Sequence, residues 1–227
     1  MNRIPAVVRM HLTDRLTIFG LPPAILAASF AVNVAIFAAE PQASRKTGGV
    51  AAIFVVLTIA AVMATARGMS FALSMGASRR SFALGTGITG AILAVAFGVL
   101  LLILNRIESA TDGWWLRGHF FTFDWLDRHN LAGGWLLATL LLLAMFLLGV
   151  FASTIWLRWR QVGMLVGGVA LFLVFGGLAA LLTWQQGWPS IGHWFAALTP
   201  LTAAGWTALL CVPLAGASYL ALRRVAI

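Results

Sequence analysis

The sequence has few charged residues and a single cysteine. Only 9% of its 227 residues are charged, and only six of them are acidic. The one cysteine, Cys211, cannot form an internal disulfide. The longest segment without any charge covers residues 161–222. A soluble core cannot hide so long an uncharged apolar stretch, so this lack of charge excludes an ordinary water-soluble domain.

Five charge-free segments together predict six membrane-spanning helices. The segments are 16–39, 47–66, 81–105, 129–157 and 161–222, and the last is long enough for two crossings. About 20 apolar residues in a helix cross a bilayer. Continuous apolar runs, without alternation, exclude a transmembrane barrel, and backbone groups in lipid must then pair within helices. The predicted fold is an all-α polytopic membrane protein with spans near 18–39, 48–67, 82–105, 134–156, 162–183 and 201–222.

The net charge of +9 reports the topology of the chain. With six crossings and the N-terminus inside, the outer loops hold equal numbers of basic and acidic residues. The whole excess then falls on the cytoplasmic side, as expected from the positive-inside rule, and both termini are cytoplasmic. The charge therefore indicates contact with anionic lipid rather than a nucleic-acid partner. The cytoplasmic residues are Arg3, Arg9, Arg15, Arg67, Arg79, Arg80, Arg158, Arg160, Arg223 and Arg224, against Asp14 alone.

The strong preference for arginine over lysine, with many alanines and glycines, is typical of a GC-rich bacterial genome. We therefore expect a multi-pass protein of a bacterial plasma membrane.

Residues 1–17 are predicted to form an amphipathic helix on the inner leaflet. Ile4, Val8 and Leu12 recur every four residues, whereas Arg9 lies on the opposite side. Such a pattern favours a helix lying in the plane of the interface. A disordered N-terminal segment is the alternative.

Two outer segments are rich in aromatic residues. Residues 106–130 are predicted to form an outer cap at the headgroup level, where aromatic rings are favoured. Residues 184–200 are predicted to form a short re-entrant or interfacial element. The cap contains metal-ligand residue types without a diagnostic spacing, so we expect solvated loop polarity and no metal site. Nothing positions its carboxylates against a nucleophile, so no catalytic residue is expected. The residues concerned are His119, Asp124, Asp127 and His129.

Several mechanistic features are missing from the sequence. No charged residue lies in the central part of any predicted span, which disfavours an ion-coupled carrier. No Gly-x-x-x-x-Gly-Lys-Ser/Thr motif is present, so the chain cannot use ATP through that loop. Segment 85–90 has the Gly-x-Gly-x-x-Gly pattern of dinucleotide-binding proteins, but it lacks the β-strand that precedes this pattern in a nucleotide site. Small residues in an apolar run favour close helix packing instead, as do Gly163 and Gly167.

Segment 71–86, with the sequence FALSMGASRRSFALGT, resembles the loop between spans two and three of type-2 ABC exporter permeases, particularly actinobacterial ones. The plan of an interfacial helix, six spans and an outer element after span five is also similar. The resemblance implies that residues 68–81 form a coupling helix that docks on a separate ATP-binding subunit. Its contact residues would come from Met69, Leu73, Gly76, Ser78, Arg79, Arg80 and Phe82.

The resemblance further implies an assembly of two permease and two ATPase subunits. The second permease would be another copy of this chain or a paralogue, and the surroundings would be membrane lipid. ATP and Mg²⁺ would bind the ATPase subunit, so this chain would carry no cofactor and no enzymatic activity of its own. The outer element at 184–200 is short and apolar, which departs from an extended outer gate.

We therefore expect the membrane subunit of an ATP-driven exporter of a hydrophobic or amphipathic substrate, such as a drug, peptide or lipid. One alternative is a membrane scaffold or sensor that acts through its outer aromatic loops. The other is an ion-coupled carrier, which would show pH- or Na⁺-dependent flux without ATP.

Overall fold

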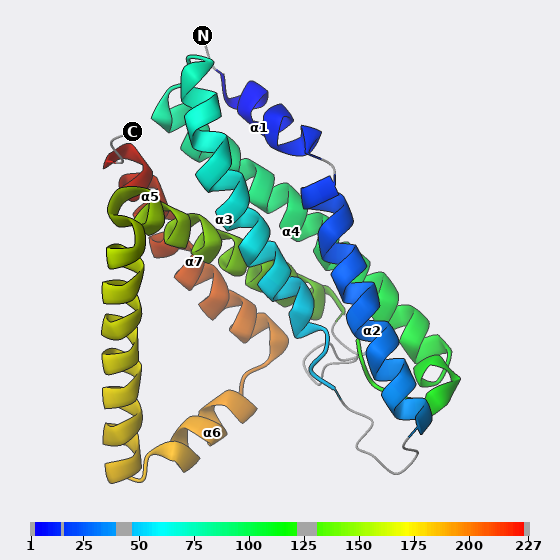
Figure 1. Ribbon diagram of the computed structural model, residues 1–227. Helices are drawn as coiled ribbons and strands as arrows, with labels where there is room; N and C mark the ends of the chain where they lie inside the picture. Colours follow the sequence, from blue (N-terminus) through cyan, green and yellow to red (C-terminus); the bar gives the residue numbers. More distant parts are fainter. Residues whose placement is uncertain (1–2, 15, 40–46, 122–130, 225–227) are drawn as a thin grey trace.

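The structure is a computed structural model that describes residues 3–14, 16–39, 47–121 and 131–224. Its described elements are helices (Figure 1). Five of them are long and apolar enough to cross a membrane. The predicted all-α membrane fold is thus confirmed at this level. Most of the predicted turn at 40–47 and residues 122–130 of the predicted cap, with Asp124, Asp127 and His129, lie outside the described residues.

The elements follow one another as a series of helices of unequal length. They are α1 (Ile4–Thr13), η1 (Leu16–Gly20), α2 (Leu21–Ala39), α3 (Ala51–Ser74), α4 (Arg79–Ala110), η2 (Gly113–Arg117), α5 (Leu131–Trp184), α6 (Trp188–Ala196) and α7 (Pro200–Arg224).

Helices α3 and α4 extend beyond the predicted spans. Helix α3 passes residue 67 and ends at Ser74, and α4 begins at Arg79 instead of residue 82 and continues to Ala110. A charged residue at a membrane surface does not end a helix, because termination depends on how the last backbone groups are capped. The predicted coupling loop 68–81 is therefore largely helical, with a short turn between the two helices.

Helix α5 consists of two arms that meet at Arg160. The backbone of this residue is non-helical, with φ 53° and ψ −140°, and the chain reverses its direction there (Figure 1). The arms cover residues 131–159 and 161–184. Each arm has the length of one membrane crossing.

The core forms around the first arm of α5, which packs against α3, α4 and α7. Leu57, Phe82 and Leu142 are fully buried in it. Close approach depends on small residues: a Cβ at Gly90 would lie 2.4 Å from the ring of Phe146. Helices in lipid associate through such close van der Waals contact. Gly85 and Gly90 of the glycine-rich segment are thus packing positions, whereas a Cβ at Gly87 would have no atom within 4 Å.

The second arm of α5 has almost no protein neighbours. None of residues 161–184, all of them described, is buried, and large side chains such as Phe172 and Phe175 are 77% and 66% exposed. Figure 1 shows this arm and α6 standing apart from the other helices. So much apolar surface must be covered by lipid or by another protein.

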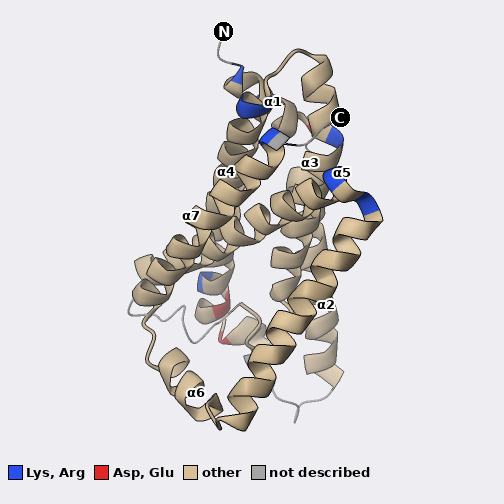
Figure 2. Cartoon of the chain, turned by 90° about the vertical axis from the view of Figure 1, so that its left-hand side faces the viewer, with Lys and Arg blue, Asp and Glu red and all other residues tan. Residues whose placement is uncertain are grey.

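Basic and acidic residues are distributed unequally between the two ends of the molecule. In Figure 2 most of the arginines lie at the end that carries both termini, which we call the arginine-rich end. Glu108 lies near the C-terminal end of α4, and Asp112 follows that helix. The acidic segments drawn red in Figure 2 lie at the end opposite the arginine-rich end.

Candidate functional site

The turn between α3 and α4 is a tightly bonded helix terminus at the arginine-rich end. Gly76 has φ +76°, and its N–H donates to the carbonyl of Leu73 at 2.9 Å. The N–H of Ala77 donates to the carbonyl of Ala72, also at 2.9 Å. This is a Schellman motif, in which glycine supplies the left-handed conformation that ends a helix. Gly76 therefore fixes where α3 stops.

Helix α4 begins immediately after this turn with a side-chain cap. Ser78 Oγ accepts a hydrogen bond from the N–H of Ser81 at 3.1 Å, as expected for a serine at the N-cap. The next residue, Arg79, donates from its guanidinium to the carbonyl of Arg223 at 3.2 Å. The start of α4 is thereby connected to the end of α7.

Helix α1 is attached to both sides of the turn. The guanidinium of Arg3 donates to the carbonyl of Met75. Further along α1, Val7 packs so closely on α4 that a Cβ at Gly85 would lie 2.7 Å from its side chain. Movement of the turn would therefore be passed on to α1.

A buried histidine strengthens the contact between α1 and α4. His11 is only 4% exposed, and its Nε2 is hydrogen-bonded to Thr86 Oγ1 at 3.0 Å. Its ring also lies 5.6 Å from that of Phe82. Burial lowers the pKa of His11 to about 4, since the charged imidazolium is disfavoured away from water. His11 is therefore neutral at pH 7.

The residues predicted to form the interfacial face of α1 lie beside the residues that pack on α4. The buried face of α1 consists of Val7 and His11, whereas the predicted apolar residues Ile4, Val8 and Leu12 are half-buried and Arg9 is exposed. The amphipathic pattern was visible in the sequence, but the packing face lies beside it. The partners of this face on α4 are about 75 residues away in the chain, which local periodicity does not reveal.

The predicted coupling residues fall into three groups by exposure. Met69 and Phe82 are fully buried in the core, so their side chains cannot contact another protein in this arrangement. Leu73 and Arg79 are half-buried. Gly76, Ser78 and Arg80 are exposed.

Two exposed apolar residues of the same turn were not predicted. Phe71 is 55% exposed and Met75 is 65% exposed, and their spacing of four places them on one face of α3. They lie two residues beyond Met69 and Leu73, on a neighbouring face. Because they belong to or border the segment for which a coupling role was predicted, we call the exposed residues Phe71, Met75 and Arg80 the coupling surface.

A groove of about 260 Å³ lies beside the coupling surface, between α1 and the end of α3. It is lined by Arg3, Met10, Phe71 and Met75, with small side chains between them. An apolar side chain of a partner protein would fit such a groove, and Arg3 would add a positive charge at its rim.

At the opposite end, a buried glutamate organises the described part of the predicted cap. Glu108, which lies within the predicted cap 106–130, is 1% exposed. Its Oε2 accepts hydrogen bonds from the indole Nε1 of Trp114 at 3.1 Å and from the N–H groups of Phe120 and Phe121 at 2.9 and 2.8 Å. A carboxylate that accepts several N–H donors fixes the path of the chain around it.

The aromatic residues of the described part of the cap pack mainly on one another. Phe120 and Phe121 are buried and contact Phe30 of α2 at ring distances of 5.3 and 5.5 Å. Trp114 lies 4.8 Å from the same ring. The cluster thus closes the end opposite the arginine-rich end, between α2 and α4, and leaves Trp115, 82% exposed, as its surface residue.

An apolar cleft of about 470 Å³ lies between α4 and α7. Gly87, Ile88 and Tyr219 are among its lining residues. Leu147 and Val150 of α5 also line it, and its lining is mainly apolar.

Within the described part of the chain, no three His, Cys, Asp or Glu side chains are grouped closely enough to hold a metal ion. Comparison of the chain with protein families, with curated proteins and with solved structures found no match.

Proposed function

We propose that this chain is the membrane subunit of an ATP-driven exporter, energised by a separate ATP-binding subunit at the arginine-rich end. The observation that carries the proposal is the coupling surface. Phe71 and Met75 expose apolar side chains at the end of α3. The turn that follows is held by backbone hydrogen bonds and by the hydrogen bond from Arg3 to the carbonyl of Met75. Large apolar side chains exposed on a rigid element favour contact with a partner protein.

The hydrogen bonds between the turn and other helices would allow a displacement of the turn to be transmitted to those helices. Arg3 ties it to α1, and Arg79 ties it to the end of α7. A partner that pushed on the coupling surface would therefore displace α1, α4 and α7 together. Packed helices transmit such displacements because their cores resist compression.

The charge distribution supports a topology of six spans with both termini in the cytoplasm. The two arms of α5 supply two crossings, and the remaining long helices supply four. Arginines collect at the end with the termini (Figure 2), which is the cytoplasmic end under the positive-inside rule. Helix α1 would then lie at the inner membrane surface.

The exposed second arm of α5 supports a second permease subunit. A Cβ at Gly167 would have no atom within 4 Å, and Gly167 lines an apolar recess of about 300 Å³ together with Gly163 of this arm and Trp159 of the first arm. Small residues on an uncovered helix permit close contact with another helix in lipid. The partner would be a copy of this chain or a paralogue.

The cleft between α4 and α7 supports a hydrophobic or amphipathic substrate. Its lining is almost entirely apolar, with the hydroxyl-bearing Tyr219 and Ser218 at one side. The alternative role as a scaffold or sensor has less support, because most aromatic residues of the described cap are buried against Phe30.

Charge reversal at the coupling surface tests the proposal. The tagged chain is purified from its native membrane, and the co-purifying ATPase is quantified for the wild type, for Met75→Asp with Arg80→Glu, and for Arg158→Glu. Arg158 is also an exposed arginine at the same end, so it is the matched control. We expect the double variant to lose the ATP-binding-cassette ATPase and the control to retain it. Retention by both variants would refute the assignment of the coupling surface.

A further inference from the structure

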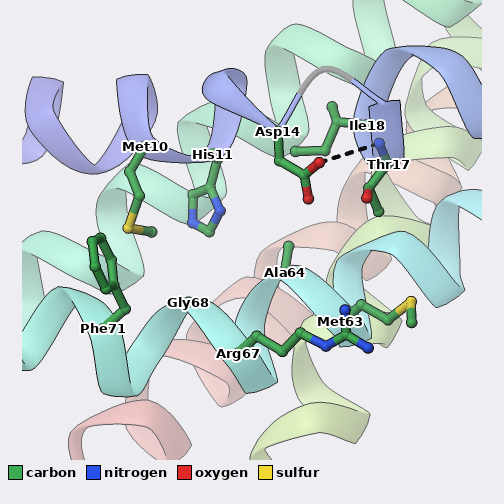
Figure 3. Close-up of a pocket in the computed structure, with 10 residues that line it drawn as sticks. All are labelled: Met10, His11, Asp14, Thr17, Ile18, Met63, Ala64, Arg67, Gly68 and Phe71. Atoms are coloured by element: carbon green, nitrogen blue, oxygen red, sulfur yellow. Dashed lines mark hydrogen bonds between the residues drawn. The ribbon is translucent and has the colours of Figure 1, made fainter.

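A second cavity at the arginine-rich end carries two opposite charges that do not pair. It has a volume of about 230 Å³ and lies between the end of α1, the start of η1 and α3. Figure 3 shows Asp14 on one wall and Arg67 on the other. Among the ten lining residues, all of them described, the hydrogen bond drawn joins the N–H of Thr17 to Asp14 Oδ1, at 3.3 Å. The carboxylate and the guanidinium each keep hydrogen-bonding capacity for a ligand.

The remaining walls of this cavity are mainly apolar. Met10 and Phe71 separate it from the groove beside the coupling surface, and Ile18 and Met63 close it on the side of the spans (Figure 3). His11 also lines it and adds no charge at pH 7, because its burial keeps the imidazole neutral. A ligand that fits must therefore combine one positive and one negative group with apolar parts.

The surroundings of the cavity indicate where the apolar parts would lie. Leu16 and Phe19, two and five residues after Asp14 and both on η1, are 79% and 40% exposed. These two side chains lie between the charged cavity and the exposed surface of α2, whose sequence is mainly apolar. Acyl chains would cover this surface while a headgroup stayed at the level of Asp14 and Arg67.

We propose that this cavity binds the headgroup of one inner-leaflet phospholipid that carries an amine, of the phosphatidylethanolamine class. Its phosphate lies at Arg67 and its ammonium group at Asp14. Arginine is suited to phosphate because its fork of donors matches the phosphate oxygens. The carboxylate selects against a purely anionic headgroup, since it would repel one. The inference rests on the membrane placement of the helices and not on an ATPase partner.

A bound lipid of this kind would join α1 to α3 through its headgroup. Asp14 follows α1, and Arg67 belongs to α3, so the lipid bridges the two elements that border the coupling surface. The site thus links the composition of the inner leaflet to the position of α1.

Native mass spectrometry of the full chain in detergent tests the site directly. Phosphatidylethanolamine, phosphatidylglycerol and phosphatidylcholine with identical acyl chains are added in turn. We expect one phosphatidylethanolamine to be retained most strongly. Arg67→Gln should weaken its retention about 10-fold, in line with the loss of a charge-assisted hydrogen bond. Asp14→Asn should abolish the preference for phosphatidylethanolamine over phosphatidylglycerol.

Matched controls separate this site from general charge effects. Arg158→Gln and Asp112→Asn remove the same charges from exposed positions elsewhere and should leave retention unchanged. Ala64→Leu fills the cavity while keeping both charges and should expel the lipid, which covers the case in which a charge variant fails to fold. Unchanged lipid retention in Arg67→Gln, Asp14→Asn and Ala64→Leu would overturn the proposal. So would binding of free phosphoethanolamine as tight as that of the lipid, since it would indicate a soluble ligand.

Discussion

Acidification is expected to loosen α1 from α4 through the buried His11. The imidazole is neutral in the folded protein because burial lowers its pKa from the ordinary value of 6.5 to about 4. In the detached helix it would return to the ordinary value. The stabilisation from the neutral form is therefore fully present above pH 6.5 and is lost as the pH falls toward 4.

The magnitude follows from the two pKa values. The difference between 6.5 and about 4 corresponds to roughly 3 kcal/mol lost once the pH is below 4, because one pKa unit is worth about 1.4 kcal/mol. At pH 5 the loss is about 2 kcal/mol. The hydrogen bond to Thr86 does not cancel it, since the cost arises from charging a ring that is removed from water.

Hydrogen–deuterium exchange of peptides from α1 measures this effect in the full chain. After correction for intrinsic exchange rates, protection of α1 should fall about 30-fold between pH 7.5 and pH 5, as a 2 kcal/mol change requires. Asp14 and Arg67 line the neighbouring cavity, so a variant is needed to assign the change to the imidazole. His11→Gln can keep a hydrogen bond to Thr86 but does not titrate, and its protection should be independent of pH in this range. An equal pH response in His11→Gln would refute the reasoning.

Three further substitutions probe single features of the fold. Glu108→Ala should lower stability by about 3 kcal/mol, because the buried N–H donors around its carboxylate lose their acceptor. Thermal unfolding in detergent measures this, and an unchanged melting temperature would contradict it. Gly76→Val should lower the free energy of unfolding by about 1–2 kcal/mol, because a β-branched residue disfavours φ +76°. The same unfolding assay measures it. Gly48→Val is the control, because a Cβ at Gly48 would have no atom within 4 Å. Gly90→Leu should separate α4 from α5, because the new leucine side chain would overlap Phe146. A disulfide between cysteines engineered into the two helices should then no longer form. Its unchanged formation would argue against close packing of α4 and α5.

The membrane-type helices could be predicted from the sequence because their signal is local. A charge-free run of about 20 residues predicts a span without knowledge of its neighbours. The ends of α3 and α4 could not be placed in the same way. Arg67 marks the end of an apolar run, whereas the helix ends at the Schellman turn formed by Gly76.

The exposed and buried faces of the coupling turn depend on distant contacts. Met69 and Phe82 are apolar residues of the same kind as Phe71 and Met75, and only the packing of α1 and the core decides which pair is buried. Likewise, nothing near Glu108 in the sequence shows that its hydrogen-bond donors come from 6 to 13 residues later in the chain. Such pairings follow from the arrangement of the helices in space, which no local pattern encodes.

Site-specific photocrosslinking tests the central proposal most directly. Phe71 and Val55, which lie on the same helix and are 55% and 58% exposed, are each replaced by the photoreactive p-benzoylphenylalanine, and native membranes are irradiated. We expect position 71 to crosslink to an ATP-binding-cassette ATPase subunit and position 55, within the span predicted at 48–67, to give no such product. Absence of the ATPase from the products at position 71, in a chain that is correctly inserted, would contradict the proposed function.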